Sequence, residues 1–385
     1  MDFSFSEEEA LFREELRDFL SKRVRPIVRK IDEEGIPRDL VKDMAKLGLW
    51  AMPVSEDVGG QKASFTLTAI AAEEIARADF SMATAVMFLL EASWGYVLDK
   101  YGKGVREEVL PKVVSGDWFL GIASTEPSGG SDVANLKTSA RKEGKHYVIE
   151  GEKSYISGVG EAKKWGGGHL TLVRTSPEGH RGISMIYVPT DQEGVETSLI
   201  SNSGRMGIST GIMRYHGIKV PVKNLVGEEN KGFYYAMDGF NHARVLVSAA
   251  CIGSAEVILE MGLNYAKERE AFGKKLKDHQ AIAFEASELY TRLEMAKLLT
   301  YKAAWMLDNE EKFRDQIPAY SAMAKLVGPQ TAFDVIKSVM MWMGAYSYTK
   351  DALVEIAYRG IASYLVGAEG AMNVMKMIIS KKIFT

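Results

Sequence analysis

The chain has 385 residues, of which 46% are hydrophobic and 26% are charged, and its formal net charge at pH 7 is −3. This length and composition indicate a folded protein of two or three domains with enough apolar side chains for a large core. Because the charge is nearly balanced and no long block of like charge occurs, the sequence gives no electrostatic support for binding nucleic acid or a membrane surface, and we expect neither.

The first part of the chain, from Asp2 to about Gly116, has the periodicity of helices. Ser6 and Glu9 form a capping-box pattern at the start of the first helix. The first 20 residues are acidic and amphipathic, unlike a secretory signal or an arginine-rich transit peptide, so we expect a cytoplasmic protein. Further helices are predicted over residues 37–47, 66–77, 81–101 and 103–115.

Between Phe119 and about Val226 the pattern changes to short β-like runs. Turn residues such as Glu150-Gly151 and Glu193-Gly194 separate these runs. The middle of the chain is therefore expected to form a small β domain. Its strands are predicted over residues 146–149, 154–156, 169–173, 182–188 and 213–220.

After Asn230 the chain becomes helical again to its end. No apolar stretch approaches the ~18 residues needed to span a bilayer. Cys251, the single cysteine, excludes an internal disulfide and, among small neighbours, is expected to be a buried thiol. Helices are predicted over residues 232–267, 280–309, 318–343 and 350–380, as in an antiparallel bundle. The sequence thus predicts a mainly α protein with a central β domain, divided into 1–118, 119–228 and 229–385.

Two segments far apart in the chain are chemically complementary. The run STEPSGGSD, from Ser124 to Asp132, combines glycines with hydroxyl side chains, so its amides and hydroxyls are available to a polar planar cofactor. Glu369, in the run Ala368-Glu369-Gly370-Ala371, offers a base on a tight turn before a final helix. Together the segments indicate an oxidoreductase. The six histidines show no metal-ligand spacing, so no metal site is expected.

The domain order, these two segments, the run Ser154-Tyr155-Ile156-Ser157 and the segment from Lys267 to Gln280 resemble the acyl-CoA dehydrogenase family over essentially the whole chain. The resemblance implies a helical N-terminal domain, a small β-barrel or sandwich in the middle and a C-terminal four-helix bundle. It also implies FAD as cofactor, an acyl-CoA as substrate and an electron-transferring flavoprotein as electron acceptor. Because the family shares cofactor contacts between subunits, a homotetramer or homodimer is expected.

The resemblance assigns four cofactor contacts to the β domain. Thr125 corresponds to a threonine that bonds the pyrimidine side of the flavin, and Ser131 to a serine that reaches the phosphate or substrate side. Tyr155 and Ser157 stand where the family often has Trp and Thr, which lie against the isoalloxazine ring and hydrogen-bond its N5. Both substitutes keep that chemistry, since they supply a flat apolar face and a short donor.

Three further cofactor contacts are implied in the helical part. Arg269 corresponds to a residue that pairs with the FAD pyrophosphate across a subunit interface. Phe272 and Gln280 are expected to line the same groove. The family usually carries a Gln where this chain has Met341, so the contact of that Gln to the adenosine diphosphate is not expected here, although flavin binding is.

Glu369 corresponds to the catalytic base of the family, which removes the α-proton of the thioester while the β-hydrogen leaves as hydride to flavin N5. The Glu369 backbone N–H and a ribityl hydroxyl would stabilise the enolate oxygen. A dry pocket would raise the Glu369 pKa toward the range of a general base. Ser131, Arg244 and Gly370 are the expected substrate contacts.

Two local departures from the family pattern surround this base. Ala368 stands where an aromatic residue usually precedes the glutamate, and there is one extra residue between Arg359 and Glu369. Because some family members carry the base on another helix, residues 255–260 are the alternative region.

Other interpretations stay open at the level of sequence. An acyl-CoA oxidase of the same fold would use oxygen, and a flavin-binding relative without activity is also compatible with the chain. The run 207–211 satisfies the G-x-S-x-G pattern of a hydrolase, but a β-like run follows Ser209 where that motif requires a helix. Gly158-Val159-Gly160 lacks the third glycine and the following helix of a dinucleotide fingerprint. Trp94 and Tyr96, on a helix expected to floor the pocket, favour a short, branched or cyclic acyl group.

Overall fold

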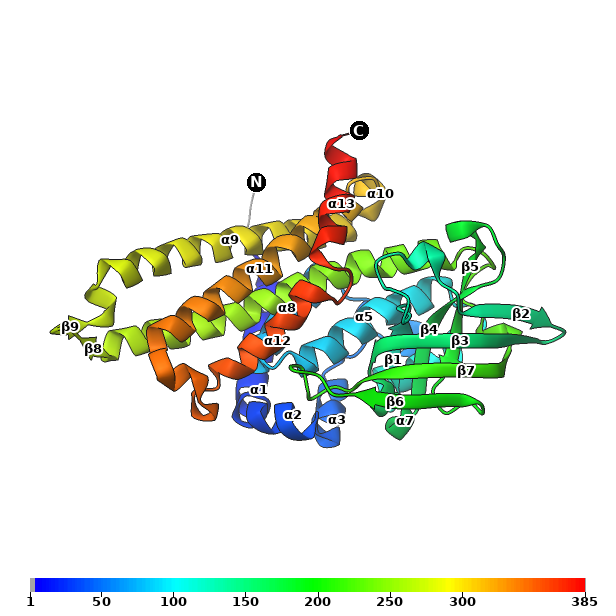
Figure 1. Cartoon of the computed structure of the whole chain (residues 1–385), viewed down its shortest axis with the longest axis horizontal. Helices are drawn as coiled ribbons and strands as arrows, with labels where there is room; N and C mark the ends of the chain where they lie inside the picture. Colours follow the sequence, from blue (N-terminus) through cyan, green and yellow to red (C-terminus); the bar gives the residue numbers. More distant parts are fainter. Residues whose placement is uncertain (1–3, 385) are drawn as a thin grey trace.

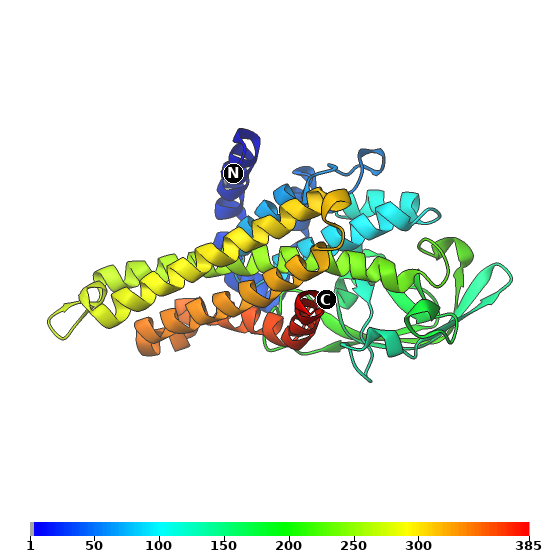
Figure 2. The ribbon, with the colours of Figure 1, turned by 90° about the horizontal axis from the view of Figure 1, so that it is seen from above.

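The computed structural model describes residues 4–384, so Asp2 and Phe3, at the start of the predicted helical region, lie outside it. Figure 1 shows N-terminal helices, a curled β-sheet at one end of the molecule, and long C-terminal helices along its long axis. Figure 2 shows from above that the long helices extend well away from the sheet. The predicted fold class, helical domain, β domain and helical domain in this order, is confirmed.

The N-terminal part begins with the predicted capping box. The Glu9 N–H donates to Ser6 Oγ (3.2 Å) and the Ser6 N–H donates to Glu9 Oε2 (2.8 Å), which pairs two otherwise free backbone donors. Every helix predicted in this part is present. The helices are α1 (Glu7–Arg23), α2 (Val28–Glu34), α3 (Arg38–Lys46), α4 (Phe65–Ala78), α5 (Ala83–Tyr101) and α6 (Arg106–Val114).

The middle part forms one seven-stranded sheet with the order β1-β4-β2-β3-β7-β6, in which β5 pairs with β4. Glu150-Gly151, predicted as a turn, is instead part of a bulge inside β3, because pairing with β7 continues on both sides of it. The strands are β1 (Phe119–Ala123), β2 (Ser139–Glu143), β3 (His146–Ser157), β4 (Gly167–Arg174), β5 (Ile183–Pro189), β6 (Val195–Ile200) and β7 (Thr210–Pro221).

The C-terminal part contains six α-helices among the described residues, with a short β-hairpin between the first two. The prediction of one helical segment over 350–380 is wrong, whereas the predicted tight turn at Glu369 before a final helix is present. The chain breaks at residues 367–371, where Ala368, Glu369 and Gly370 have φ values of 50°, 56° and 114°, which a right-handed helix does not accommodate. The elements are α8 (Gly232–Glu268), β8 (Glu270–Ala271), β9 (Lys274–Lys275), α9 (Gln280–Asp308), α10 (Glu310–Phe313), α11 (Ile317–Met343), α12 (Val354–Val366) and α13 (Met372–Ile383).

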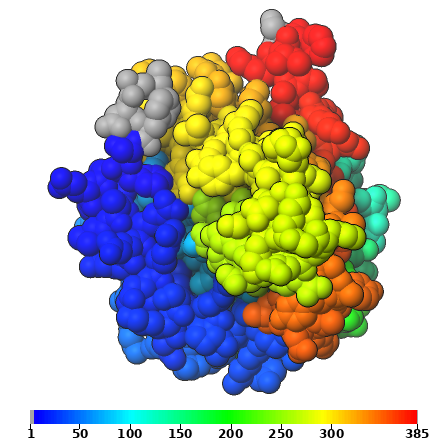
Figure 3. Space-filling model, turned by 90° about the vertical axis from the view of Figure 1, so that its left-hand side faces the viewer, coloured from blue at the N-terminus to red at the C-terminus, as the bar shows by residue number. Residues whose placement is uncertain are grey.

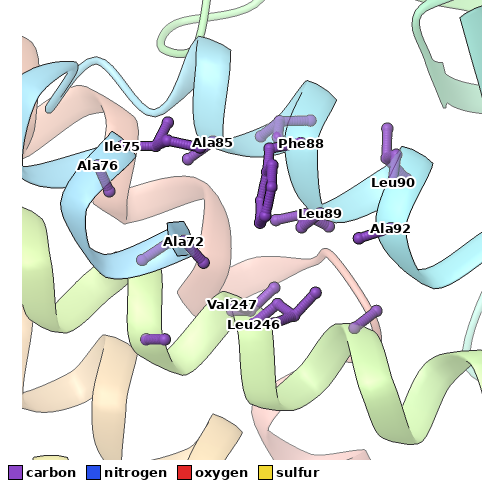
Figure 4. Packing of buried hydrophobic residues seen from close by; sticks show 14 of the residues in the cluster. Ala72, Ile75, Ala76, Ala85, Phe88, Leu89, Leu90, Ala92, Leu246 and Val247 are labelled. Carbon is purple, nitrogen blue, oxygen red and sulfur yellow. The ribbon is translucent and has the colours of Figure 1, made fainter. Parts of the chain in front are cut away.

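Helix α8 is the centre of the core. It packs against α4 and α5 of the N-terminal part and against α9 and α11 of its own part. Figure 4 shows apolar side chains of α4, α5 and α8 in close packing, among them Ala72, Phe88 and Leu246. The α4 and α8 backbones approach so closely that a Cβ on Gly253 would lie 1.9 Å from the Glu73 carbonyl oxygen.

The apolar composition of α8 corrects one expectation from the sequence. An 18-residue window of this helix has a mean hydropathy of 1.6, so by length and composition alone the helix meets the criterion for a membrane span. However, 83% of that window is buried inside the protein. Cys251 lies on this helix and is buried, as predicted. The apolar composition therefore reflects a helix that lies largely inside the protein.

Candidate active site

A cavity of about 750 Å³ lies where the sheet, α5, α8 and the 367–371 turn meet. Six of the residues that the sequence singled out border it, although they come from distant parts of the chain. Those on the sheet side are Thr125, Ser131, Tyr155 and Ser157, and those on the helical side are Glu369 and Gly370.

The 124–132 loop is anchored from below by the Glu126 carboxylate. Glu126 accepts hydrogen bonds from the backbone N–H groups of Lys137 (2.7 Å) and Thr138 (2.8 Å) and from Lys153 Nζ (2.9 Å). Burial would raise the pKa of Glu126, but Lys153 and the other donors outweigh it and lower this pKa to about 2. The carboxylate therefore stays charged at neutral pH and fixes the loop to β3.

The hydroxyl groups on the sheet side of the cavity are free to bind a ligand. The side chains of Thr125, Ser131 and Ser157 make no hydrogen bond to any other part of residues 4–384, and neither do the backbone N–H groups of Gly130 and Ser131. A Cβ on Gly130 would lie 3.0 Å from Thr125 Oγ1, so glycine keeps this hydroxyl accessible. This set of donors and acceptors fits the rim of a polar planar ring such as the flavin.

A bulge in β3 presents Tyr155 to the cavity. The pairing of β3 with β7 shifts between Lys153 and Ile156, and Tyr155 has a φ of 59°. A left-handed φ is uncommon for a bulky residue, and β-bulges often re-aim side chains beside active sites. The Tyr155 ring is 68% exposed as a result, so it stands out of the sheet and offers a flat face to the cavity.

A neutral histidine holds the end of β3 where Ser157 lies. His169 Nε2 lies 3.0 Å from the Ser157 carbonyl oxygen. Burial lowers the pKa of His169 to about 4, so the ring is neutral at physiological pH and Nε2 carries the proton that this carbonyl accepts.

Glu369 lies on the turn between α12 and α13 and is the free carboxylate of the cavity. Its Oε2 atom is buried and has no hydrogen-bond partner among residues 4–384. Burial raises the pKa of Glu369 to about 7, against the opposing positive charges of Arg244, Lys325 and Arg205. The other carboxylate that borders the cavity, Glu126, is held by three donors. Glu369 therefore has the environment expected of a general base.

Arg244 lies beneath the turn and not among the residues that border the cavity. Its Nε donates to the carbonyl oxygen of Glu369 (3.0 Å), and its Nη1 donates to Asn241 Oδ1 (3.1 Å). Burial lowers the pKa of Arg244 to about 10, so the guanidinium remains charged at neutral pH. The structure thus joins Arg244 to the backbone of Glu369.

The helical wall of the cavity is apolar. It is formed by Val86, Leu89 and Leu90 of α5, Ile122 of β1 and Phe240 of α8. The prediction that Trp94 and Tyr96 form the floor is wrong. Trp94 lies behind the wall, edge-on to Phe240 with ring centroids 5.2 Å apart, and Tyr96 packs on His242 beside a separate hollow. Tyr96 is seven residues beyond Leu89, so it lies about two turns further along α5, outside the cavity.

Arg269, Phe272 and Gln280 lie at the end of the molecule remote from the sheet (Figure 1). Arg269 follows α8, Phe272 is in the β8–β9 hairpin and Gln280 begins α9. All three are exposed, and Phe272 is 97% exposed. Figure 3, which faces this end, shows the α8 and α9 ends as a projecting knob. Within one chain, the structure does not bring these residues to the cavity.

The competing motifs have structural roles. As predicted, Ser209 directly precedes a strand, and its hydroxyl donates to Glu161 and accepts from the Gly160 N–H (2.7 Å). The expectation that no helix follows Gly158 is wrong, because α7 (Val159–Trp165) does. This helix has only seven residues, and the Ser209 hydroxyl already accepts the hydrogen bond of the Gly160 N–H in its first turn.

The alternative region for the base, residues 255–260, is also accounted for. Glu256 pairs with Lys297 (2.6 Å) and Arg77 (3.4 Å), and Glu260 pairs with Arg77 (2.6 Å). Neither carboxylate borders the cavity. Within residues 4–384 there is also no group of three or more His, Cys, Asp or Glu side chains suited to a metal ion.

Three polar residues near Glu369 were not predicted from the sequence. Arg205 and Tyr364 border the cavity, and their buried Nε and Oη atoms have no partner in the described chain. Lys325 lies under the turn and donates to its carbonyl groups. A lone lysine in the apolar run 322–327 was the one signal that pointed to it.

Comparisons with known proteins match this chain over nearly its whole length. The chain matches the acyl-CoA dehydrogenase N-terminal, middle and C-terminal domains over residues 6–117, 121–218 and 230–384. It is 33% identical to mitochondrial isobutyryl-CoA dehydrogenase of Dictyostelium discoideum, over 98% of this chain and 89% of the relative. It is 31% identical to subunit CarC of the caffeyl-CoA reductase-Etf complex of Acetobacterium woodii, over 98% of each chain. The structure of glutaryl-coenzyme A dehydrogenase with glutaryl-CoA superposes with a TM-score of 0.93 at 29% identity, covering 100% of this chain and 97% of that chain.

Proposed function

We propose residue roles, a substrate class and partners for this chain on the premise that it belongs to the acyl-CoA dehydrogenase family, whose three domains match it almost throughout. The chain is accordingly an FAD-dependent oxidoreductase that dehydrogenates an acyl-CoA thioester between its α and β carbons. The observation that carries the residue roles is the partnerless carboxylate of Glu369 in a cavity with free hydroxyls.

Glu369 is the proposed general base. Its buried Oε2 accepts the α-proton of the thioester, and its pKa of about 7 leaves a large share of the carboxylate ionised at neutral pH. The backbone N–H groups of Glu369 and Gly370 have no partner among residues 4–384, so they are available to the carbonyl oxygen, which gains negative charge as the proton leaves. When bound, FAD supplies the acceptor for the β-hydride.

The proposed cofactor site is shared between two subunits. In one chain, the hydroxyls of Thr125, Ser131 and Ser157 bind the flavin, and the Tyr155 ring lies against it. Arg269, Phe272 and Gln280 are exposed and distant from this cavity, so we assign them to the cofactor of a second copy. Helix α9 also exposes a row of large apolar side chains, which supports a homotetramer or homodimer. These side chains are Phe284, Met295, Leu298 and Trp305.

The proposed substrate carries a short, branched or cyclic acyl group. The wall formed by Val86, Leu89, Leu90, Ile122 and Phe240 offers only apolar contacts, so a charged group against it would lose hydration without compensation. Trp94 packs against the side of Phe240 that faces away from the cavity, so the Phe240 ring cannot move back to make room for a larger acyl group. The relative from Dictyostelium discoideum is an isobutyryl-CoA dehydrogenase, which agrees with a small branched group.

The proposed electron acceptor is an electron-transferring flavoprotein, because the relative from Acetobacterium woodii is a subunit of a complex with Etf. We place the domain boundaries at 118/119 and 228/229, since β1 begins at Phe119 and α8 at Gly232. A cytoplasmic location stays a prediction.

The experiment that tests this function is an anaerobic absorbance titration of the FAD-loaded protein with isobutyryl-CoA, butyryl-CoA, cyclohexanoyl-CoA and palmitoyl-CoA. Bleaching of the flavin by a small thioester is expected, with loss of bleaching in Glu369→Gln. Fast reoxidation by oxygen would indicate an oxidase instead. Bound flavin that no thioester bleaches would indicate a relative without this activity.

A further inference from the structure

Lys325 of α11 is a buried cation whose hydrogen bonds go to the turn that carries Glu369 and to the helix ends on either side of it. Its side chain is fully buried. Its Nζ donates to the carbonyl oxygens of Tyr364 (2.8 Å), Gly367 (3.2 Å) and Gly370 (2.6 Å). Because an ammonium group has three N–H bonds, these three carbonyls use its full donor capacity. The burial of a charged group is tolerated only with such satisfaction.

These carbonyls bracket the base. Tyr364 belongs to the last turn of α12, whose carbonyl groups have no partner within the helix, and Gly367 and Gly370 lie on either side of Glu369. The carbonyl of Glu369 itself is taken by Arg244 from α8. Two cations from two core helices therefore hold the carbonyl groups on the core side of the turn.

The turn has a conformation that its own sequence does not favour. Ala368 and Glu369 both have a left-handed φ, although neither is glycine, and Gly370 follows with a φ of 114°. Residues in this region persist only where the surrounding structure imposes them. The N–H groups of residues 368–371 make no hydrogen bond within the described chain, so they do not hold the turn.

We propose that Lys325 is a positioning residue of the active site, which fixes the 367–371 turn through the carbonyls of Gly367 and Gly370, and the end of α12 through that of Tyr364, and so places the Glu369 carboxylate. This inference rests on the proposed role of Glu369 as the base. Lys325 touches neither the cavity nor the carboxylate, and it acts through the backbone.

The charge of Lys325 gives the proposal a second readout. The charged groups that face Glu369 are Arg244 from α8, Lys325 from α11 and Arg205 from the segment before β7, and Tyr364 of α12 is the neighbouring neutral acid. All three cations favour the carboxylate form. Loss of the Lys325 charge is therefore expected to shift the pH dependence of proton abstraction upward.

The test is the FAD-loaded Lys325→Met variant, which removes the three donors and the charge but keeps an unbranched side chain only one heavy atom shorter. Anaerobic flavin reduction by isobutyryl-CoA is measured from pH 5.5 to 9, with amide hydrogen exchange over residues 362–372. We expect reduction at saturating substrate to fall by about 100-fold, as for a displaced reacting group, with KM changed only a few-fold. The rise of the reduction rate with pH should move to higher pH, and the backbone amides of the turn should exchange faster.

Lys297→Met is the matched control, because Lys297 is also largely buried and paired, with Glu73 (3.0 Å) and Glu256 (2.6 Å), but lies away from the turn. It is expected to lower the melting temperature and leave the pH limb unchanged. Should Lys325→Met fail to fold, Lys325→Gln, which also removes the charge, carries the same measurements.

A folded Lys325 variant with wild-type reduction, pH limb and amide exchange would overturn the proposal. Glu369→Gln separates this failure from a failure of the proposed function. If Glu369→Gln abolishes flavin reduction while the Lys325 variants behave as wild type, only the role of Lys325 falls. If Glu369→Gln reduces flavin normally, the base itself is wrongly assigned and the positioning role falls with it.

Discussion

The pH dependence of flavin reduction follows directly from the surroundings of Glu369. Burial raises the pKa of this carboxyl from 4.5 to about 7, against the opposing charges of Arg244, Lys325 and Arg205. A shift of about 2.5 units corresponds to roughly 3 kcal/mol at 1.36 kcal/mol per unit. Because the carboxylate is the reactive form, kcat/KM is expected to rise with pH and to level off above about pH 8.

The decrease of kcat/KM at low pH follows from the fraction of Glu369 that is ionised. With a pKa of about 7, kcat/KM at pH 6 should be about tenfold below its plateau, and at pH 5 about 100-fold below it. Glu369→Gln should lower the plateau by roughly 10² to 10⁴-fold, the usual contribution of a general base, and its residual rate should no longer depend on pH in this range.

The assay is stopped-flow bleaching of bound FAD under anaerobic conditions, with a subsaturating thioester, so that the limb reports the free enzyme. Glu369→Asp is a useful companion, because it keeps the carboxylate but withdraws it by one methylene. It should lower the rate about 100-fold and still show a pH limb. A limb below pH 5, where an ordinary carboxyl titrates, would refute the reasoning, since the base would then not be buried.

Three further predictions concern stability and cofactor binding. Lys153→Met leaves the buried Glu126 carboxylate without its opposite charge, so the free energy of unfolding should fall by about 3–5 kcal/mol. The FAD content after gel filtration should also fall, and Lys153→Met/Glu126→Gln should restore both in part. Arg269→Gln should weaken FAD retention while the circular dichroism stays unchanged, because this side chain is exposed; retention equal to wild type would remove it from the cofactor site. The folded-state pKa of Glu369 is raised, so the contribution of this group to stability is fully present below about pH 4.5 and is lost as the pH rises through about 7. Glutamine does not titrate, so the stability of Glu369→Gln relative to wild type should increase by up to about 3 kcal/mol between pH 4 and pH 8. Thermal unfolding at the two pH values measures this difference.

Most helices of this fold could be predicted from the sequence because their apolar positions repeat with the helical period. The errors arose where distant contacts override a local signal. Glu150-Gly151 has the composition of a turn, but pairing with β7, far along the chain, keeps both residues within β3. The helix predicted over 350–380 ends at Val366, where the only local signals are two glycines, Gly367 and Gly370.

The candidate site shows the same division between local and distant information. The hydroxyl and glycine composition of the 124–132 loop and the turn around Glu369 could be recognised as strings of residues. The face of α5 that meets the cavity could not, because its rotation is set by packing on β1 and α8. Neither could the contact of Arg244 with the Glu369 carbonyl, since it depends on how α8 passes under a turn 125 residues later in the chain.

The departures from the family pattern around the base make sense in terms of the turn. A left-handed φ costs of order 1–3 kcal/mol at a non-glycine residue and is worst for bulky side chains, so Ala368 suits the φ of 50° better than an aromatic residue would. Hydrogen bonds from charged donors contribute about 1.5–3 kcal/mol each, so those from Lys325 and Arg244 are large enough to offset this strain. The position of Glu369 is therefore set by α8 and α11 more than by its neighbours in sequence, which is why an extra residue before the turn still leaves the carboxylate in the cavity.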